Sequence, residues 1–366
     1  MSENPLLSSL PQFYLGAVTP HGYIQYTQHL KKAGDGWRTY ILKGAPGSGK
    51  ARFLEELAAE LSLHYENLEL VICPFQQDTL DGIILHDIGV NILNGSYPHP
   101  VEPEIPMACD HLIPLGEWTA EPSSLERQEM VHLWELLQKN AQQCRRFLEA
   151  ASSLLEDARQ IALSHTDLEK IQQFAARFST REIPPSQFGK GEESLRFLSA
   201  FTNKGPCTLE QTPLLLCGYI THIQDEYGAA SGEVLDALRR EFLGKGFDII
   251  TCRCPLLHKI DHLFVPELGL GFMTQNKFHH LGILPDKTIH AQRFTDMDEV
   301  RKSLARLSWD RKAAREMISH TCQLLEYGGE IYCRLRYYGQ QAANPTQADQ
   351  QLYQLIRFLL ENCPPL

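Results

Sequence analysis

Apolar positions in residues 40–57 change their spacing once, and this change marks the first recognisable unit of the chain. A short continuous apolar run at 40–42 is typical of a buried strand. After a glycine-rich turn, Phe53, Leu54 and Leu57 recur at helical spacing. The pattern predicts a strand, a loop and a helix in that order.

A similar pattern occurs twice along the chain. Four positions near the N-terminus recur 183 residues later, namely Leu15/Leu198, Ala17/Ala200, Thr19/Thr202 and Gly22/Gly205. Residues 68–95 and 247–275 form a second match, in which a β-rich run ends in Cys-Pro and an aspartate opens the next apolar segment. Here Asp81 corresponds to Asp261 and Gly89 to Gly269, both 180 positions apart. The matches indicate a tandem duplication.

Long helices follow each β-rich region. Ser123 and Glu126 form a capping box, and apolar residues then alternate by four and three over 130–162, as in a coiled coil. A shorter helical pattern over 168–178 should fold back on it as an antiparallel hairpin. The second copy repeats the arrangement over 300–335 and after Pro345. The hairpins are expected to pack within the molecule or, alternatively, to bind a protein partner.

The segment 181–194 carries two prolines, two glycines and several charges, which favours a linker. The chain of 366 residues is long enough for two domains. We therefore predict domains at 1–182 and 183–366. The predicted fold is α/β, with two tandem P-loop NTPase-like domains that have mainly parallel sheets, each followed by a helical hairpin, the second copy being degenerate.

The charge and hydropathy of the chain limit the classes of molecule that it is expected to bind. Lys and Arg number 34 against 45 Asp and Glu, and the net charge of −11 argues against general affinity for nucleic acid or for anionic membranes. No apolar stretch is long enough to span a bilayer, and the N-terminus lacks a signal-peptide pattern. A cytoplasmic location is expected, in which the ten scattered cysteines would mostly be reduced.

The glycine-rich turn matches the Walker A pattern Gly44-x-x-x-x-Gly49-Lys50. Backbone N–H groups of such a loop curl around phosphate, and the lysine reaches the β- and γ-phosphates. The expected cradle consists of Gly44, Ala45, Pro46, Gly47, Ser48, Gly49, Lys50, Ala51 and Arg52. The other interpretation is a strand-to-helix turn that binds nothing.

Both positions that usually hold Mg²⁺ are altered. The residue after Lys50 is Ala51, where the pattern requires a Ser or Thr hydroxyl. The strand predicted at 90–93 ends in Asn94, where an aspartate is usual. Asn94 and Asp81 are therefore the candidate ligands of a weak Mg²⁺ site, and Asp81 is alternatively a turn or cap residue, since the second copy retains it.

In the second copy the corresponding strand is predicted at 214–217, and the helix begins before Val234. The alignment places Glu233 where Lys50 stands in the first copy. A carboxylate there would repel phosphate. The second copy is therefore predicted to keep the fold and to have lost the nucleotide site.

These motifs together resemble an uncharacterised bacterial family of tandem P-loop ATPases, also described as nucleotide-kinase-like. The matching segments are residues 15–22, 41–50, 80–90 and 94–103. The resemblance implies ATP binding by the first copy. Members with the intact pattern have Ser or Thr at position 51 and Asp at position 94, so this chain is a divergent member.

We therefore predict a nucleotide-binding protein, with ATP as the ligand and weak or slow ATPase activity. Catalytic residues and the biological substrate are not identified by the sequence. The alternative is a catalytically inactive, nucleotide-sensing or structural scaffold that acts through its helical hairpins. A third interpretation, a small-molecule kinase, requires an acceptor pocket with a base, and the sequence indicates none.

Overall fold

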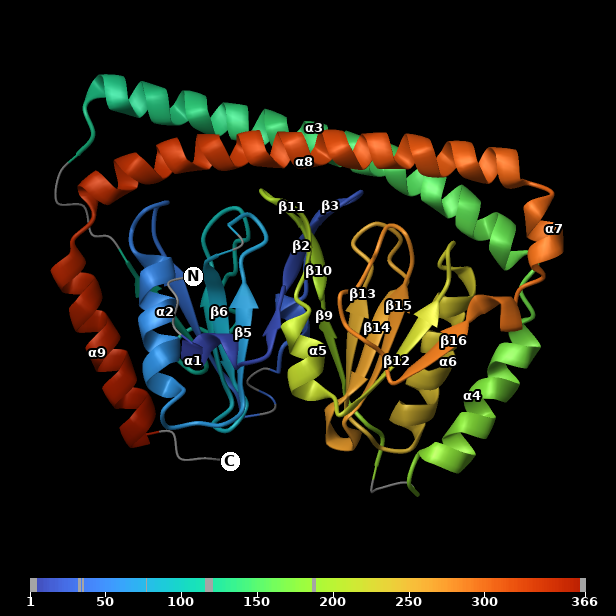
Figure 1. Cartoon of the computed structure of the whole chain (residues 1–366). Coiled ribbons are helices and arrows are strands. Elements are labelled where there is room, and N and C mark those ends of the chain that lie inside the picture. The colour runs from blue at the N-terminus through green and yellow to red at the C-terminus, as the bar shows by residue number, and fades with distance from the viewer. Residues whose placement is uncertain are drawn as a thin grey trace.

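The computed structural model describes residues 5–31, 34, 36–76, 78–115, 121–185 and 189–362. Residues 186–188 of the predicted linker lie outside this part. The described chain forms an α/β fold with two six-stranded mixed sheets, each mostly parallel, and helices packed against them (Figure 1). The two-domain layout and the α/β class agree with the sequence-based prediction.

The first sheet has the strand order β1-β5-β6-β7-β4-β8. The strands are β1 (Gln12–Phe13), β4 (Arg38–Lys43), β5 (Leu68–Ile72), β6 (Leu80–Leu85), β7 (Val90–Asn94) and β8 (Asp110–Pro114). Only β6 runs antiparallel to its neighbours, whereas β4 is parallel to β7 and β8 on either side. The carboxyl ends of β4 and β7 therefore meet at one edge of the sheet.

The second sheet repeats this order as β9-β13-β14-β15-β12-β16. Its strands are β9 (Glu193–Arg196), β12 (Tyr219–Gln224), β13 (Ile249–Arg253), β14 (Ile260–Val265), β15 (Leu270–Gln275) and β16 (Lys287–His290). Each copy also has a small hairpin, β2 (Gly16–Thr19) with β3 (Gly22–Gln25) and β10 (Ser199–Thr202) with β11 (Gly205–Thr208). The matched order confirms the duplication.

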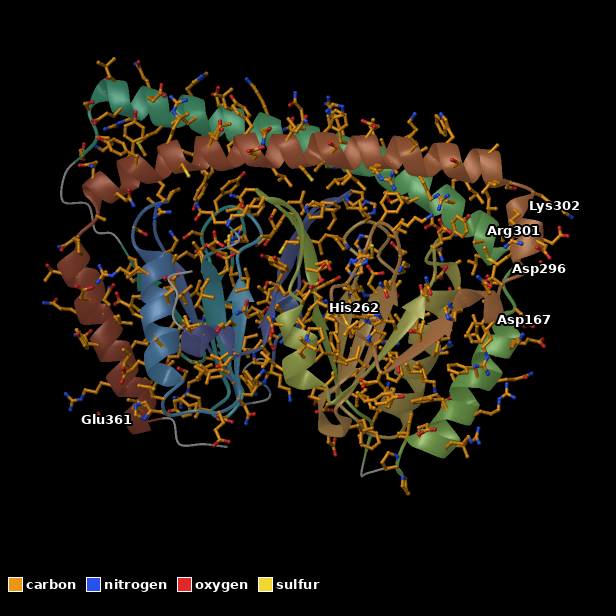
Figure 2. All side chains as sticks on the ribbon, in the orientation of Figure 1. Asp167, His262, Asp296, Arg301, Lys302 and Glu361 are labelled. Carbon is orange, nitrogen blue, oxygen red and sulfur yellow. The ribbon has the colours of Figure 1, made fainter. Side chains whose placement is uncertain are left out.

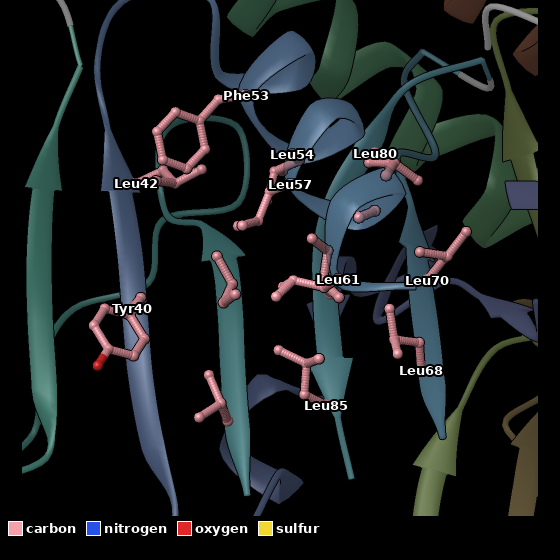
Figure 3. Close-up of a cluster of buried hydrophobic side chains, with 14 of the residues drawn as sticks. Tyr40, Leu42, Phe53, Leu54, Leu57, Leu61, Leu68, Leu70, Leu80 and Leu85 are labelled. Carbon is pink, nitrogen blue, oxygen red and sulfur yellow. The ribbon is translucent and has the colours of Figure 1, made fainter. Parts of the chain in front are cut away.

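Helix α2 (Lys50–Leu61) packs on the first sheet through the apolar face that the sequence predicts. Phe53, Leu54 and Leu57 face Leu42 of β4 and the neighbouring strands, and all are almost fully buried (Figure 3). Burial of each such side chain stabilises the fold by about 1.5–3 kcal/mol. This packing fixes the start of α2 directly after the glycine-rich loop.

The two longest helices pair with each other. Helices α3 (Ser124–Leu163) and α8 (Leu304–Ala342) run side by side across both sheets (Figure 1). The capping box of Ser123 and Glu126 is present at the start of α3. Within the seam, Asn140 donates a hydrogen bond to the Leu324 carbonyl oxygen at 2.7 Å. The seam predicted from the sequence therefore joins the two copies.

The predicted hairpins are wrong, because each short helix packs on the other copy. Helix α4 (Leu168–Glu182) packs on α6 (Ala229–Gly244) of the second copy, and α9 (Pro345–Asn362) packs on α2 of the first (Figure 1). The reason is length: a helix of 40 residues is about 60 Å long and carries its end past the second sheet. The predicted cut at residue 183 thus separates the sheets, while helices cross it in both directions.

The position of the second strand is also corrected. Residues 214–216, predicted as strand, belong to helix α5 (Gln211–Leu216), and the strand is β12, five residues later. Pro213 lies in the first turn of α5, where its missing N–H is tolerated. Consequently α6 starts at Ala229, which takes the place of Lys50, and Glu233 lies one turn into the helix.

Short elements complete the chain. They are α1 (Pro5–Ser8) and α7 (Met297–Arg301). Asp167 and Asp296 cap α4 and α7 at the same end of the molecule (Figure 2). Among the residues that the structure describes, no helix combines the length and apolar character that crossing a bilayer requires.

Candidate phosphate-binding site

The loop between β4 and α2 has the geometry of an anion cradle. Gly47 and Gly49 have φ of 91° and 94°, a left-handed conformation that glycine adopts without strain. Gly49 is the N-cap of α2, and no side chain caps the helix. The first N–H groups of a helix have no partner within it, so they remain available to a ligand.

Lys50 stands at the first position of α2, and its side chain folds back over the loop. Its Nζ donates hydrogen bonds to the carbonyl oxygens of Gly44 at 2.7 Å and Ala45 at 2.8 Å, and to Ser48 Oγ at 3.3 Å. Burial lowers the pKa of Lys50 to about 8, against the opposing effect of nearby Asp81. The ammonium group is thus present at the loop, but is bonded to its carbonyls.

Helix α8 of the second copy covers one side of the loop. A methyl group on Gly339 would clash with the Pro46 carbonyl oxygen, and one on Gly47 with that of Arg336. Backbones approach this closely only where glycine lies on both sides. Because of this contact, Tyr332, Arg336 and Gln340 line the same cavity as the loop.

The cavity between the loop and α8 has a volume of about 320 Å³. Of the predicted cradle, Gly47, Gly49, Lys50, Ala51 and Arg52 line it directly. The remaining predicted residues support the loop from behind, since Gly44 donates to Ser96 Oγ and Ser48 is buried beneath Lys50; these residues are Gly44, Ala45, Pro46 and Ser48. All nine predicted residues therefore belong to one structural unit.

Among the described lining residues, Lys50, Arg52 and Arg336 are cationic and Glu55 and Asp81 are carboxylates. Arg336 could not be assigned to the site from sequence, because only the unforeseen crossing of α8 brings it there. Arg52 is paired with Glu56 and Asp349, so Lys50 and Arg336 balance the two carboxylates of the lining. The feature that favours an anionic ligand is therefore the uncapped start of α2 beside Lys50.

The two metal candidates lie side by side on the cavity floor. Asn94 Nδ2 donates to Asp81 Oδ1 at 3.0 Å, and Asp81 Oδ2 lies 2.7 Å from His99 Nε2. Burial alone would raise the pKa of Asp81, but the charge of His99 and the hydrogen bonds from His99 and Asn94 together lower it. Asp81 and Asn94 thus lie together in the structure, whereas their binding of Mg²⁺ stays a prediction.

Two further residues of the floor were missed. His99 and Cys73 are not among the site residues predicted from the sequence, yet both lie against Asp81. A signal existed: the offset of 180 that relates Asp81 to Asp261 also relates His99 to His279. A histidine retained together with an aspartate indicates a shared environment.

In the second copy, a carboxylate of the protein occupies the position that corresponds to the phosphate cradle. The Asp225 carboxylate accepts hydrogen bonds from the backbone N–H of Ser231 at 2.8 Å and of Tyr227 at 3.2 Å, at the start of α6. Glu233, the residue predicted to repel phosphate, instead interacts with Arg159 of α3. The physical obstacle to an anion in this copy is therefore Asp225, which places a carboxylate where phosphate would bind.

Comparisons of the chain with protein-family models, with curated proteins and with solved structures found no match. The resemblance to tandem P-loop ATPases accordingly stays a prediction. What defines the candidate site is its own geometry: a glycine-rich loop, an uncapped helix start and a cavity lined by both cationic and carboxylate side chains.

Proposed function

We propose that the cavity beneath α8 binds the phosphates of a nucleoside triphosphate, with ATP as the expected ligand. The observation that carries the proposal is the uncapped start of α2, which opens into a cavity lined by Lys50 and Arg336. Backbone N–H groups and the helix dipole favour an anion at that point. The volume of about 320 Å³ lies within the range of small-molecule sites.

Binding involves one local rearrangement. Lys50 Nζ leaves the carbonyl oxygens of Gly44 and Ala45 and donates to phosphate oxygens instead, in charge-assisted hydrogen bonds that are stronger than those it gives up. Arg336 approaches from the opposite wall and supplies a second positive charge. The phosphates are thereby held between the first copy and a helix of the second.

We further propose that any hydrolysis is slow. Ala51 has no hydroxyl for Mg²⁺, and Asn94 carries no charge and already donates to Asp81. Mg²⁺ would then be held mainly by phosphate oxygens and water, where it would neutralise phosphate charge. The described residues include no assigned catalytic base.

Isothermal titration calorimetry with ATP and ADP, with and without Mg²⁺, tests the proposal. Lys50→Ala should weaken ATP binding by about 1.5–3 kcal/mol, roughly 10–100-fold. Lys170→Ala removes an exposed lysine from α4 and should leave the affinity unchanged. Absence of ATP and ADP binding at millimolar ligand, or an unchanged affinity in Lys50→Ala, would refute it.

A second candidate is a nucleotide-sensing scaffold, and the direct contact between Gly339 of α8 and the loop at Pro46 favours it. A ligand that moves this loop must move against α8, which spans both copies. The variant carrying Ala51→Ser and Asn94→Asp separates the candidates. A slow enzyme should gain turnover, whereas a scaffold should show only altered Mg²⁺ dependence together with nucleotide-dependent hydrogen exchange in α8.

A further inference from the structure

Three side chains from three separate elements converge on the cavity floor. Cys73 follows β5, Asp81 lies in β6 and His99 follows β7, and all three are buried. One ligand atom from each lies within 4.8 Å of the other two. Cys73 Sγ is 3.9 Å from His99 Nε2, which in turn is 2.7 Å from Asp81 Oδ2.

One sulfur, one imidazole nitrogen and one carboxylate oxygen form a set that suits Zn²⁺ and related borderline ions rather than Mg²⁺. Tetrahedral zinc separates nitrogen and oxygen ligands by about 3.3 Å, so the His99–Asp81 contact must open by about 0.6 Å. Asn94 already orients the carboxylate by donating to its Oδ1, which leaves Oδ2 for an ion. Tyr23 and Phe75 surround His99 with aromatic rings.

The second copy has a corresponding cluster, in which a lysine of the protein supplies the positive charge. It carries the corresponding residues Cys254, Asp261 and His279, and a fourth, Lys259, whose Nζ pairs with Asp261. The Lys259 ammonium also interacts electrostatically with Cys254 and His279. A cation belonging to the protein thus occupies this cluster.

The first copy has Thr79 at the position of Lys259. The equivalence is structural, because Cys73 N donates to the Thr79 carbonyl oxygen at 3.0 Å and Cys254 N to that of Lys259 at 2.8 Å. Lys50 is the lysine of the first copy that lies near Asp81, but its Nζ donates hydrogen bonds to the carbonyl oxygens of the glycine-rich loop. The Cys73–Asp81–His99 cluster therefore has the ligands of a cation site and no lysine of its own in that place.

We propose that Cys73, Asp81 and His99 bind a Zn²⁺-class metal ion whose fourth coordination position faces the cavity. The Cys73 thiol loses its proton to solvent on binding, and His99 coordinates through Nε2 with its proton on Nδ1. Three protein ligands with one open position are typical of zinc sites that hold water or a ligand oxygen. The open position lies in the same cavity as the phosphate loop, but metal binding does not depend on nucleotide.

Titration of the metal-free full-length protein with Co²⁺ alone, followed by Zn²⁺ competition, tests this inference. We expect one ion per chain and the absorption band of a Co²⁺–thiolate bond. Cys73→Ser should abolish the band, and Cys254→Ser, the matched change in the second copy, should retain it. His99→Asn should weaken binding by more than the roughly 10–100-fold that changes outside the ligand set produce.

Thr79→Lys is a second test that does not depend on whether the ligand variants fold. It places a lysine, as in the second copy, at the half-buried turn position of Thr79. It should abolish Co²⁺ binding while far-UV circular dichroism and thermal unfolding stay close to wild type. Absence of a thiolate band at millimolar Co²⁺ would overturn the inference. So would a band that persists in Cys73→Ser or in folded Thr79→Lys.

Discussion

The two copies have the same strand order, but the charged groups around the corresponding cavities have different partners. In the second copy, Asp225 occupies the N–H groups at the start of α6, and Lys259 pairs with Asp261. In the first copy Gly44 stands at the end of the corresponding strand and Thr79 replaces the lysine. The second copy thus balances these groups with its own side chains, whereas we propose that a phosphate and a metal ion fill the corresponding positions of the first copy.

The difference teaches that loss of a nucleotide motif need not empty a site. Burial lowers the pKa of Lys259, but the charges of Asp261, Cys254 and Asp225 and the hydrogen bond to Asp261 together raise it, which favours the charged state. Asp261 has its pKa lowered to about 2, mainly by Lys259 acting against burial. Both copies have thus retained the buried aspartate, which lies beside Lys259 in the second copy and beside His99 in the first.

The largest expected effect concerns the contact that joins the copies. Arg196 of β9 and Glu69 of β5 form a bidentate ion pair, with Nε to Oε1 at 2.5 Å and Nη2 to Oε2 at 3.2 Å, and both side chains are buried. Arg196→Ala removes the guanidinium partner of the buried Glu69 carboxylate and leaves His86 Nε2 at 3.5 Å as a longer contact. It should lower the free energy of unfolding by about 3–5 kcal/mol. Urea denaturation measures this.

The matched control is Arg239→Ala, which breaks a partly exposed pair with Glu193 within the second copy. Such pairs contribute about 0–1 kcal/mol. If both variants lost the same stability, the two copies would not be joined through Glu69 and Arg196 as described.

The contact of α8 with the loop gives the next effect. Gly339→Ala places a methyl group against the Pro46 carbonyl oxygen and should destabilise the protein by about 1–3 kcal/mol, despite the higher helix propensity of alanine. It should also weaken ATP binding, because the loop must shift. Gly244→Ala, at the end of α6 with open space around it, should change stability by less than about 1 kcal/mol. Equal thermal unfolding of both variants would contradict the close packing.

The pKa of Lys50 sets a third, smaller effect. Because its pKa is lowered to about 8 in the folded protein, the ammonium form that binds phosphate is lost above that pH. ATP affinity should fall roughly 10-fold between pH 7 and pH 9, measured by calorimetry. Lys50→Arg keeps its charge over this range, so its affinity should stay constant. A wild-type affinity independent of pH would place the binding elsewhere.

The smallest effect concerns the missing hydroxyl. Ala51→Ser adds one oxygen beside the phosphate position and should strengthen the dependence of ATP binding on Mg²⁺ by a factor of about 10 or less, the value of one hydrogen bond. Titrations at several Mg²⁺ concentrations check this. Ala59→Ser makes the same change further along α2, at a half-buried position that does not line the cavity, and serves as the control, since it should not alter the Mg²⁺ dependence.

The sequence predicted the parts that local patterns determine. The period change at 40–57 located β4, the loop and α2, and the matched residues revealed the duplication. The sequence could not predict that α4 packs on the second copy and α9 on the first. An apolar helix face indicates that the helix is buried, but not which element it packs against. The second strand was misplaced because 214–217 is more apolar than β12, whose His222 and Thr221 are nonetheless buried.

The sequence identified the part of the candidate site that is contiguous in the chain. It did not identify the residues that the fold brings together from distant segments. The cradle residues are contiguous, so one motif named them all. Cys73, His99 and Arg336 reach the cavity from a strand end, a loop and a helix of the other copy. The retained spacing of His99 and His279, together with the matched Cys-Pro of Cys73 and Cys254, carried a trace of that assembly in the sequence.

We propose that the first copy binds the phosphates of a ligand at the start of α2, whereas in the second copy Asp225 occupies the corresponding position. Calorimetric titration of the full chain with ATP tests it most directly, through the stoichiometry and its dependence on Lys50. The account predicts one site per chain, with an affinity that Lys50→Ala weakens roughly 10–100-fold. Two sites per chain, or no detectable binding at millimolar ATP, would contradict it.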